Sequence, residues 1–532
     1  MRARSPSPRR RFLQGSLAAG SLFLPAPWAW VWAQSEGAVK LLRAPKLALV
    51  VGNAAYRAVP ALKNPGNDAR AIAKALGESG FEVTLVQDAT HGAMLEAIDA
   101  YARALAARKG VGLFYFAGHG LQMQWRNYLL PVDAKVASAS DVAAQCVDIS
   151  GLMGGVRSAA NPMNVVILDA CRDNPFAGDV RPEQKGLSQM DAPTGTLLAY
   201  ATAPGNTADD GPGVNGLYTE NLLREMKVRE AKIEDVFKRV RLGVRRASGG
   251  RQIPWESTSL EEDFYFVPPE QLRKLSAAEE EREFREEFAV FEKVKEAKDP
   301  APLEQYLRRY PSGRFAELAQ LRLDAVLAAQ GERPVEPAPA QGNPFTAGTV
   351  RAGGKARVGD RLSYDVIDRL SWGGKATRLD LVVTEVTDAH VMFNNGLVVR
   401  DLMGNTVRTK NGQEFSPRQD HPLEYAVGKK WSTRYDVSRK GAVQGTVTME
   451  FRVAARETVT VPAGTFDCFR VEGHGVNRRR EGPPVDVYIT RWNAPGRVRG
   501  PVAIEEVRRA TPGGHVKVLF SERMELASFE QR

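Results

Sequence analysis

The first half of the chain alternates between short apolar runs and stretches with helical spacing. Residues 47–52, 111–116 and 164–169 are largely apolar runs, typical of strands that are buried on both faces. Residues 68–76 and 90–107 have the spacing of helices and lie between such runs. Repeated alternation of strand and helix predicts an α/β fold with a mostly parallel sheet and helices on both faces.

Two prolines, Pro268 and Pro269, follow this first unit, which we expect to cover residues 45–267. Residues 270–329 then keep helical spacing throughout and predict a helical connector that resembles one or two tetratricopeptide-like units. A docking element and a plain connector packed on its neighbour both fit this pattern.

The last third of the chain changes to a period of two. Residues 330–348 are rich in Pro, Ala, Gly and Glu and predict a linker. From 349 to 532, alternating segments such as 379–386 and 447–453 are separated by turns that contain glycine. This pattern predicts an all-β domain, either a sandwich or an open barrel. Its residues do not point to a particular ligand.

Length and composition are those of a soluble multidomain protein. The chain has 532 residues, of which 43% are hydrophobic and 26% charged, so about three domains are expected. The formal net charge is +10, but the basic residues are spread along the chain. No basic stripe with interleaved aromatic residues and no reader motif is present, which argues against a nucleic-acid partner.

Residues 1–33 have the pattern of an export signal. Arg9, Arg10 and Arg11 precede Phe12-Leu13, as in the twin-arginine motif, and a proline-interrupted apolar run follows. The run is short for a membrane-spanning helix. We therefore predict a periplasmic or otherwise extracytoplasmic protein, with a membrane-anchored form, in which the signal is not cleaved, as the alternative.

Three cysteines are too few for a disulfide framework in an exported protein of this size. With an odd number, at least one thiol stays free within a single chain. Cys468 lies in a segment of period two and is expected in the core, and Cys146 is expected to be half-buried structure. Neither has the setting of a reactive residue.

The third cysteine and a histidine follow two of the apolar runs. His119 lies within Gly118-His119-Gly120, and Cys171 comes after the run 164–169. Because parallel strands end at the same edge of a sheet, the two side chains meet if their strands are neighbours. A free thiol has a pKa of about 8.5 and is mostly protonated at neutral pH, so an adjacent imidazole would activate it as a nucleophile.

The glycines beside His119 fit this chemistry. They leave the local backbone unobstructed, and the N–H groups of Gly120 and Cys171 are candidate donors to the oxyanion of a tetrahedral intermediate. Taken alone, Gly-His-Gly is a weak motif, and a cysteine after a strand is more often a packing residue. The order and strand-end placement of both favour the catalytic interpretation.

Residues 46–267 resemble a known family. The matching segments are residues 49–53 with Tyr56, 62–64 with 67–69, 115–120, 128–133, 168–175, 252–256 and 263–266. In this order they are similar to bacterial caspase-like proteins of the metacaspase branch of the caspase/gingipain clan. The interval of 52 residues from His119 to Cys171 is also close to the roughly 50 residues typical of caspases. The resemblance implies His119 as general acid and base and Cys171 as nucleophile.

The resemblance also suggests a substrate class. Acidic residues line the pocket for a basic P1 side chain in metacaspases, and Asp68 and Asp169 match those positions. A carboxylate pair suits the fork of Arg or the ammonium of Lys. A helix cap for Asp68 and a loop-orienting carboxylate for Asp169 are the structural alternatives. Arg172 departs from the eukaryotic pattern, which leaves specificity and calcium dependence open.

Asp209-Asp210-Gly211 either lines the same pocket, binds a cation, or forms a solvated loop. The resulting hypothesis is an exported cysteine endopeptidase that acts on protein or peptide substrates after Arg or Lys, without a cofactor. The alternative is a catalytically silent caspase-fold scaffold of the cell envelope. In either case the C-terminal β domain would face an envelope partner, and the sequence does not give the oligomeric state.

Overall fold

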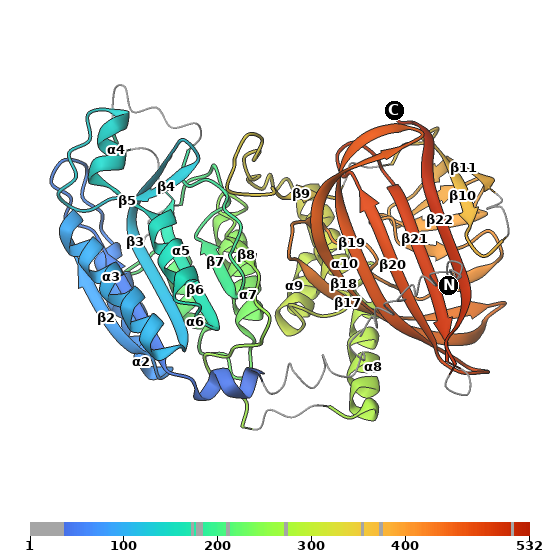
Figure 1. Ribbon diagram of the computed structural model, residues 1–532, viewed down its shortest axis with the longest axis horizontal. Coiled ribbons are helices and arrows are strands. Elements are labelled where there is room, and N and C mark those ends of the chain that lie inside the picture. Colours follow the sequence, from blue (N-terminus) through green and yellow to red (C-terminus); the bar gives the residue numbers. More distant parts are fainter. Residues whose placement is uncertain are drawn as a thin grey trace, which may run out of the picture.

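The computed structural model describes the chain from residue 37 onward, with short internal gaps. The described ranges are 37–171, 175–176, 185–208, 213–270, 275–352, 356–371, 376–511 and 515–532. An α/β lobe and an all-β lobe lie side by side, with a group of helices between them (Figure 1). The predicted export signal, residues 1–33, falls outside the described part. Within that part, no helix is long and apolar enough to cross a membrane.

The α/β lobe is built on a central sheet with the strand order β2-β1-β3-β6-β7-β8. These strands are β1 (Lys46–Gly52), β2 (Glu82–Gln87), β3 (Val111–Met123), β6 (Met163–Cys171), β7 (Thr196–Tyr200) and β8 (Trp255–Thr258). All neighbours in this order are parallel except β7 and β8, which are antiparallel. The predicted α/β fold with a mostly parallel sheet is confirmed.

Helices cover both faces of this sheet. They are α2 (Pro65–Glu78), α3 (His91–Arg108), α4 (Ala139–Gln145), α5 (Ile149–Ser158), α6 (Leu217–Glu225) and α7 (Ile233–Ser248). The chain moves from β1 outward to β2 and then back past β1 to β3, so right-handed crossovers put α2 and α3 on opposite faces. In agreement, α2 packs against α6, and α3 packs against α5.

Strand β3 is longer than the sequence pattern suggested. The apolar run 111–116 was expected to end the strand, yet β3 continues to Met123 and pairs with the antiparallel strand β4 (Arg126–Leu129). Gln124 and Trp125 form the turn, both with positive φ. The expectation was wrong because the extension is held by this hairpin, which also pairs with β5 (Val147–Asp148), and not by the parallel core alone.

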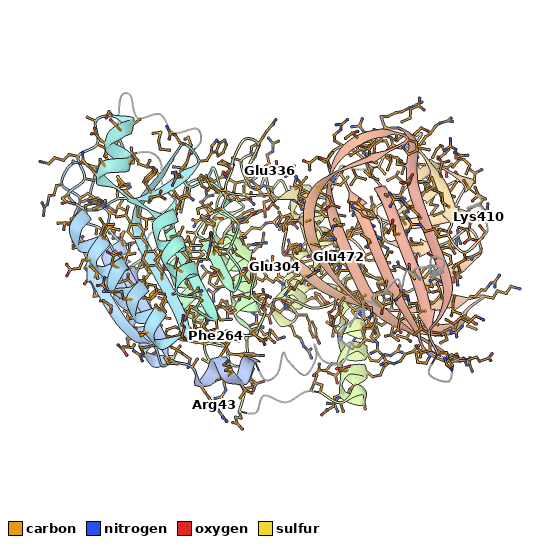
Figure 2. All side chains as sticks on the ribbon, viewed as in Figure 1. Arg43, Phe264, Glu304, Glu336, Lys410 and Glu472 are labelled. Atoms are coloured by element: carbon orange, nitrogen blue, oxygen red, sulfur yellow. The ribbon has the colours of Figure 1, made fainter. Side chains whose placement is uncertain are left out.

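Helices α8 (Ala277–Val294), α9 (Pro300–Arg309) and α10 (Ala316–Ala329) occupy the segment predicted as a helical connector. Their apolar side chains share one core with Leu242 of α7, which docks them on the α/β lobe. Ion pairs support this contact. Arg245 of α7 binds Asp324 at 2.6 Å, and Arg246 binds Glu304, which lies between the lobes in Figure 2, at 2.6 Å.

Residues 330–348, predicted as a linker, run along the α/β lobe without forming a helix or strand. The N–H of Val335 donates to the Gly250 carbonyl at 2.9 Å, and the N–H of Ala338 donates to the Pro204 carbonyl at 2.8 Å. Further on, the Asn343 amide donates to the Gln189 carbonyl at 2.8 Å. We call residues 332–347 the strap, because it is fastened to this lobe along its length.

The C-terminal lobe is a closed barrel. Its strands, in order, are β10 (Arg361–Asp368), β11 (Ala376–Val386), β12 (His390–Phe393), β13 (Val398–Asp401), β14 (Thr406–Arg408), β15 (Gln413–Phe415), β17 (Lys430–Arg439), β18 (Ala442–Val461), β19 (Gly464–Arg479), β20 (Val485–Asn493), β21 (Pro501–Ala510) and β22 (Lys517–Glu530). β9 (Val350–Arg351) and β16 (Glu424–Tyr425) pair separately.

The all-β prediction is confirmed, but the predicted sandwich or open barrel was wrong. Pairing of β10 with β22 closes the barrel, and these strands lie about 150 residues apart in sequence. Local alternation predicts single strands and hairpins, whereas closure depends on this long-range pairing. In Figure 1 the last strands of the chain form the near wall of the barrel.

Candidate active site

His119 lies inside β3, at a shift in the pairing register with β6 between Ala117 and Gly120. Its backbone N–H donates to Tyr56 Oη at 2.7 Å, and the two rings lie 4.7 Å apart between centroids. His119 Nε2 lies 3.1 Å from the Pro60 carbonyl oxygen. Because a carbonyl only accepts, Nε2 carries the proton of the neutral ring and Nδ1 holds the basic lone pair. The site thereby fixes both the position and the tautomer of the imidazole.

The two glycines beside His119 are required by close packing. Gly118 has φ +154°, and a Cβ there would lie 2.5 Å from Tyr56 Oη. A Cβ on Gly120 would lie 2.7 Å from the carbonyl oxygen of Ala170 on β6. Larger residues would therefore push Tyr56 away from His119 or separate β3 from β6.

The backbone of Cys171 ends β6 and pairs with Gly120, the residue after His119. The structure thus brings the two predicted segments together at one edge of the sheet, as expected for neighbouring parallel strands. The side chain of Cys171 lies outside the described part of the structure, as do Arg172, Asp209 and Asp210.

Asp68 and Asp169 are both buried, with exposed fractions of 3% and 7%. Asp169 Oδ2 accepts a hydrogen bond from Thr219 Oγ1 at 2.8 Å and lies 3.5 Å from Tyr115 Oη. Asp68 Oδ1 accepts from the Gly216 N–H at 3.0 Å. The two carboxylates therefore come from α2 and β6 and are held in part by residues at or near the start of α6.

The structural alternative for Asp68 was wrong. Asn64 is the N-cap residue of α2, and Asp68 lies within the first turn of the helix, on its buried side. A capping carboxylate would bind the free N–H groups of its own helix, whereas Asp68 binds the Gly216 N–H, which is far away in sequence.

Tyr115 lies beside Asp169 and is affected by the charges of both carboxylates. Burial raises the pKa of Tyr115 well above its ordinary value, and the charges of Asp169 and then Asp68 raise it further. Both carboxylates also accept hydrogen bonds from the start of α6, Asp68 from the Gly216 N–H and Asp169 from Thr219 Oγ1, so they lie in the same region of the domain. Tyr115 belongs to β3, four residues before His119, so this acidic pair lies at the same end of the sheet as the candidate catalytic residues.

Residues 45–265 match the family model described as the caspase domain. This segment is therefore similar to a caspase domain, and is called the caspase domain for that likeness. Over 238 residues the chain is 28% identical to mucosa-associated lymphoid tissue lymphoma translocation protein 1 of Homo sapiens and to its homolog of Mus musculus. The match covers 44% of this chain and 28% of each relative. The helical segment and the barrel lie outside residues 45–265.

Several residues of the caspase domain were not predicted as part of the site. Tyr115 belongs to an apolar strand run and to the matching segment 115–120, but neither pattern predicts it as a site residue. Thr219 is a single polar residue within a helix, and no motif in the sequence marks it. Pro60 contributes through its carbonyl, which no side-chain motif reveals. Tyr56 was noted among the matching segments, but its hydrogen bond to the His119 backbone depends on tertiary structure.

The other two cysteines are not candidates for the nucleophile. Burial raises the pKa of Cys146 to about 12, and burial raises the pKa of Cys468 to about 12 as well. Both thiols stay protonated near neutral pH and are unreactive. Cys468 lies in the barrel core, as predicted, whereas Cys146 is buried and not half-buried, because it packs against β4 and neighbouring residues of the caspase domain.

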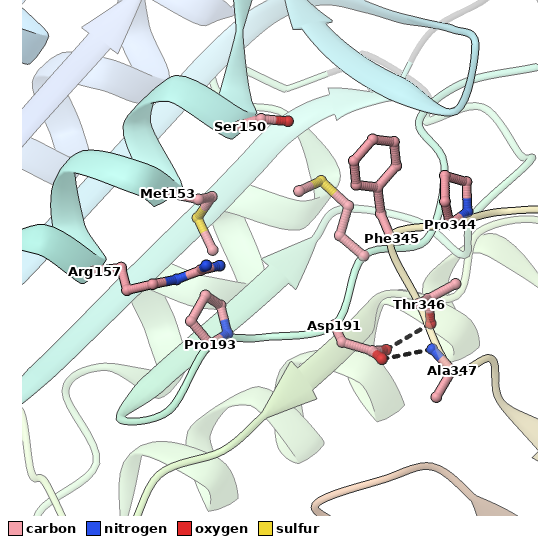
Figure 3. A pocket seen from close by; sticks show the side chains of 10 residues that line it. Ser150, Met153, Arg157, Asp191, Pro193, Pro344, Phe345, Thr346 and Ala347 are labelled. Atoms are coloured by element: carbon pink, nitrogen blue, oxygen red, sulfur yellow. Dashed lines mark hydrogen bonds between the residues drawn. The ribbon is translucent and has the colours of Figure 1, made fainter. Parts of the chain in front are cut away.

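A separate pocket of about 570 Å³ lies between α5 and the strap. Figure 3 shows Asp191 bound to Thr346 and Ala347 of the strap at its rim, with Arg157 of α5 on the other side. Neither His119 nor the acidic pair lines it, so it is distinct from the candidate active site. Among the described residues, no group of three or more His, Cys, Asp or Glu could hold a metal ion.

Proposed function

We propose that this chain is a cysteine endopeptidase that cleaves peptide bonds after Arg or Lys. The observation that carries the proposal is a pair of buried carboxylates, Asp68 and Asp169, that both accept hydrogen bonds from the start of α6 in a segment that matches the caspase domain. Carboxylates bind the guanidinium of Arg or the ammonium of Lys through charge-assisted hydrogen bonds. A basic P1 side chain that reaches this end of the sheet would meet both carboxylates.

The reaction would proceed through a thioacyl-enzyme. His119 Nδ1 accepts the proton of the Cys171 thiol, and the thiolate attacks the scissile carbonyl carbon. The N–H groups of Gly120 and Cys171 are the proposed donors to the oxyanion of the tetrahedral intermediate. The imidazolium then gives its proton to the leaving amine as the C–N bond breaks. Water, deprotonated by His119, hydrolyses the thioester and restores the thiol.

The P1 pocket would rely on how Asp169 is held. Thr219 Oγ1 and Tyr115 Oη both approach Oδ2, which fixes the carboxylate. Tyr115 Oη also lies 2.6 Å from Thr219 Oγ1, so the three groups form one small network. A guanidinium can bind two carboxylates through its planar fork, whereas an ammonium forms fewer directed bonds. We therefore expect Arg to be preferred over Lys.

A panel of fluorogenic peptides tests this proposal. The reduced protein is incubated with matched peptides that carry Arg, Lys or Asp at P1, beside the variants Cys171→Ala, Asp68→Asn and Asp169→Asn. Asp99→Asn on the exposed side of α3 is the matched control. We expect cleavage after Arg and Lys, none with Cys171→Ala, and at least a tenfold loss of kcat/KM in both pocket variants.

Other outcomes would redirect the assignment. If Cys171→Ala cleaves the peptides as fast as wild type, Cys171 is not the nucleophile. If cleavage occurs only after Asp, the pocket does not select a basic P1 residue. Absence of turnover, with and without calcium, would favour the catalytically silent scaffold. The asparagine variants keep the size of each side chain, so circular dichroism should report an unchanged fold.

Export is a further part of the proposal and rests on the sequence alone. The twin-arginine pattern at Arg9–Arg11 supports it, and the barrel would then face a partner in the envelope. Cell fractionation tests it: the protein should occur in the periplasmic fraction, and replacing Arg9, Arg10 and Arg11 by Lys should retain it in the cytoplasm. Equal periplasmic yield with that variant would contradict the proposal.

A further inference from the structure

The interior of the barrel contains arginines on opposite walls. Arg400 of β13 lies directly opposite Val391 of β12, and opposed residues point to the same face of a sheet. Val391 belongs to the apolar core, so Arg400 faces inward. Arg491 of β20 is buried between Ile489 and Asn493 on the inner face of its strand. In the closed strand order β13 and β20 are half a circuit apart.

Arg400 lacks a counter-charge. Among the described residues its guanidinium has no hydrogen bond or ion pair, and it lies over the Phe393 ring, 5.1 Å from the centroid. Burial lowers the pKa of Arg400 below its ordinary value. Tyr364 raises this pKa, whereas the positive charge of Arg491 lowers it. An unpaired cation inside a protein is costly, which calls for an anion that the chain itself does not supply.

Four buried donors of the C-terminal lobe also have no acceptor within the described part of the chain. They are Arg491 Nε, Asn493 Nδ2, Gln419 Nε2 and Tyr364 Oη. Asn493 shares the inner face of β20 with Arg491, and Gln419 precedes Asp420, to which Arg491 donates at 3.1 and 3.3 Å. Most buried polar groups in proteins have partners, so these donors would be stabilised by an acceptor.

The carboxylates nearby are already engaged. Asp420 accepts from both Arg418 and Arg491, and its N–H donates to Asn405 Oδ1 at 2.7 Å. Glu506 pairs with Arg508 at 2.6 Å. Burial raises the pKa of Asp401 to about 6, although Asn405 and Met403 donate hydrogen bonds to it. Its carboxylate oxygens are therefore engaged by donors of its own loop.

We propose that the barrel binds an organic anion, with a carboxylate or phosphate group between Arg400 and Arg491 and an apolar body against the surrounding rings. The guanidinium groups supply charge-assisted hydrogen bonds to the oxygens, and the amides of Asn493 and Gln419 complete the donor set. Phe393 and Tyr364 from the barrel core, together with Phe451, which lies 5.7 Å from Arg491, supply the apolar contacts. The site is independent of the proposed peptidase chemistry.

Calorimetric titration and thermal shift of the full chain test the proposal with four probes: acetate, inorganic phosphate, decanoate and decyl phosphate. Decanoate or decyl phosphate should bind and raise Tm, and Arg400→Met should weaken binding at least tenfold. Arg378→Met, which removes an exposed ion pair with Asp365, is the matched control and should bind as wild type does. Binding by inorganic phosphate or acetate alone would identify the anion group without the apolar body.

The Arg400→Met variant removes an unpaired charge and should fold with an equal or higher Tm in the absence of probe. Arg400→Lys keeps the positive charge but lacks the planar guanidinium, so this variant should bind the probes with intermediate affinity. Binding by none of the four probes, or unchanged affinity in Arg400→Met, would overturn the proposal. Peptidase activity of Arg400→Met should equal that of wild type, which separates this site from the active site.

Discussion

The backbone N–H of His119 donates to Tyr56 Oη at 2.7 Å, while the Tyr56 ring lies against the imidazole. This contact holds the histidine at the point where β3 departs from regular pairing with β6. Register irregularities of this kind often redirect a side chain toward a site. Tyr56 is thus a positioning residue for the candidate general base.

Replacing Tyr56 by Phe should keep the ring contact and leave the His119 N–H without its acceptor. A buried donor without a partner costs about 1–3 kcal/mol, so we expect lower stability and about a tenfold lower kcat with little change in KM. Steady-state kinetics on an Arg peptide and the pH profile of kcat/KM measure this. Tyr488→Phe in the barrel is the control, and an unchanged kcat in Tyr56→Phe would contradict the assigned role.

Gly120→Ala should destabilise the caspase domain. The new Cβ would lie 2.7 Å from the Ala170 carbonyl oxygen, and the two strands must separate to relieve the overlap. We expect a loss of about 1–3 kcal/mol in urea unfolding and loss of activity. Gly151→Ala in α5 meets no atom within 4 Å and should be neutral or stabilising. Equal stability of the two variants would refute the close-packing argument.

Asp191→Asn should loosen the strap. The Asp191 carboxylate accepts from Thr346 Oγ1 at 2.5 Å and from the Ala347 N–H at 2.6 Å, the contacts drawn in Figure 3. An amide oxygen can accept only part of these hydrogen bonds, so cleavage by chymotrypsin after Phe345, within the strap, should become faster. Limited proteolysis with mass spectrometry measures the rate, with Asp99→Asn as control. Identical rates would show that these bonds do not hold the strap.

Stability should fall in acid partly because of His421. Burial lowers the pKa of His421 to about 3, and the charge of Arg491 acts in the same direction. Between about pH 3 and 6.5 the unfolded chain binds a proton that the folded chain does not, so stability is lost as pH falls through this range. The contribution is up to about 2 kcal/mol at pH 5. Urea unfolding at pH 7.5 and 5 should show a smaller difference for His421→Gln than for the exposed control His515→Gln. Equal pH dependence in both would contradict this assignment.

The sequence predicted the parts of the site that depend on chain direction and residue type. Buried parallel strands place His119 and Cys171 at one edge, and the spacing of apolar residues reveals those strands. The sequence pattern did not predict that β3 extends to Met123, because this extension is stabilised by its hairpin pairing with β4. The role of Thr219 could not be predicted, because it depends on the tertiary contact of α6 with Tyr115 of β3. Closure of the barrel could not be predicted either, because it depends on the long-range pairing of β10 with β22.

The central claim is that Cys171 is the nucleophile of a site that accepts a basic residue. Active-site labelling tests it most directly: reduced protein is treated with peptidyl chloromethyl ketones that carry Arg or Asp at P1, and the labelled peptide is mapped by mass spectrometry. We predict one label, on Cys171, from the Arg reagent, at least tenfold faster than from the Asp reagent and absent in His119→Ala. Labelling of Cys146 or Cys468 instead, or equal rates with the two reagents, would contradict the account.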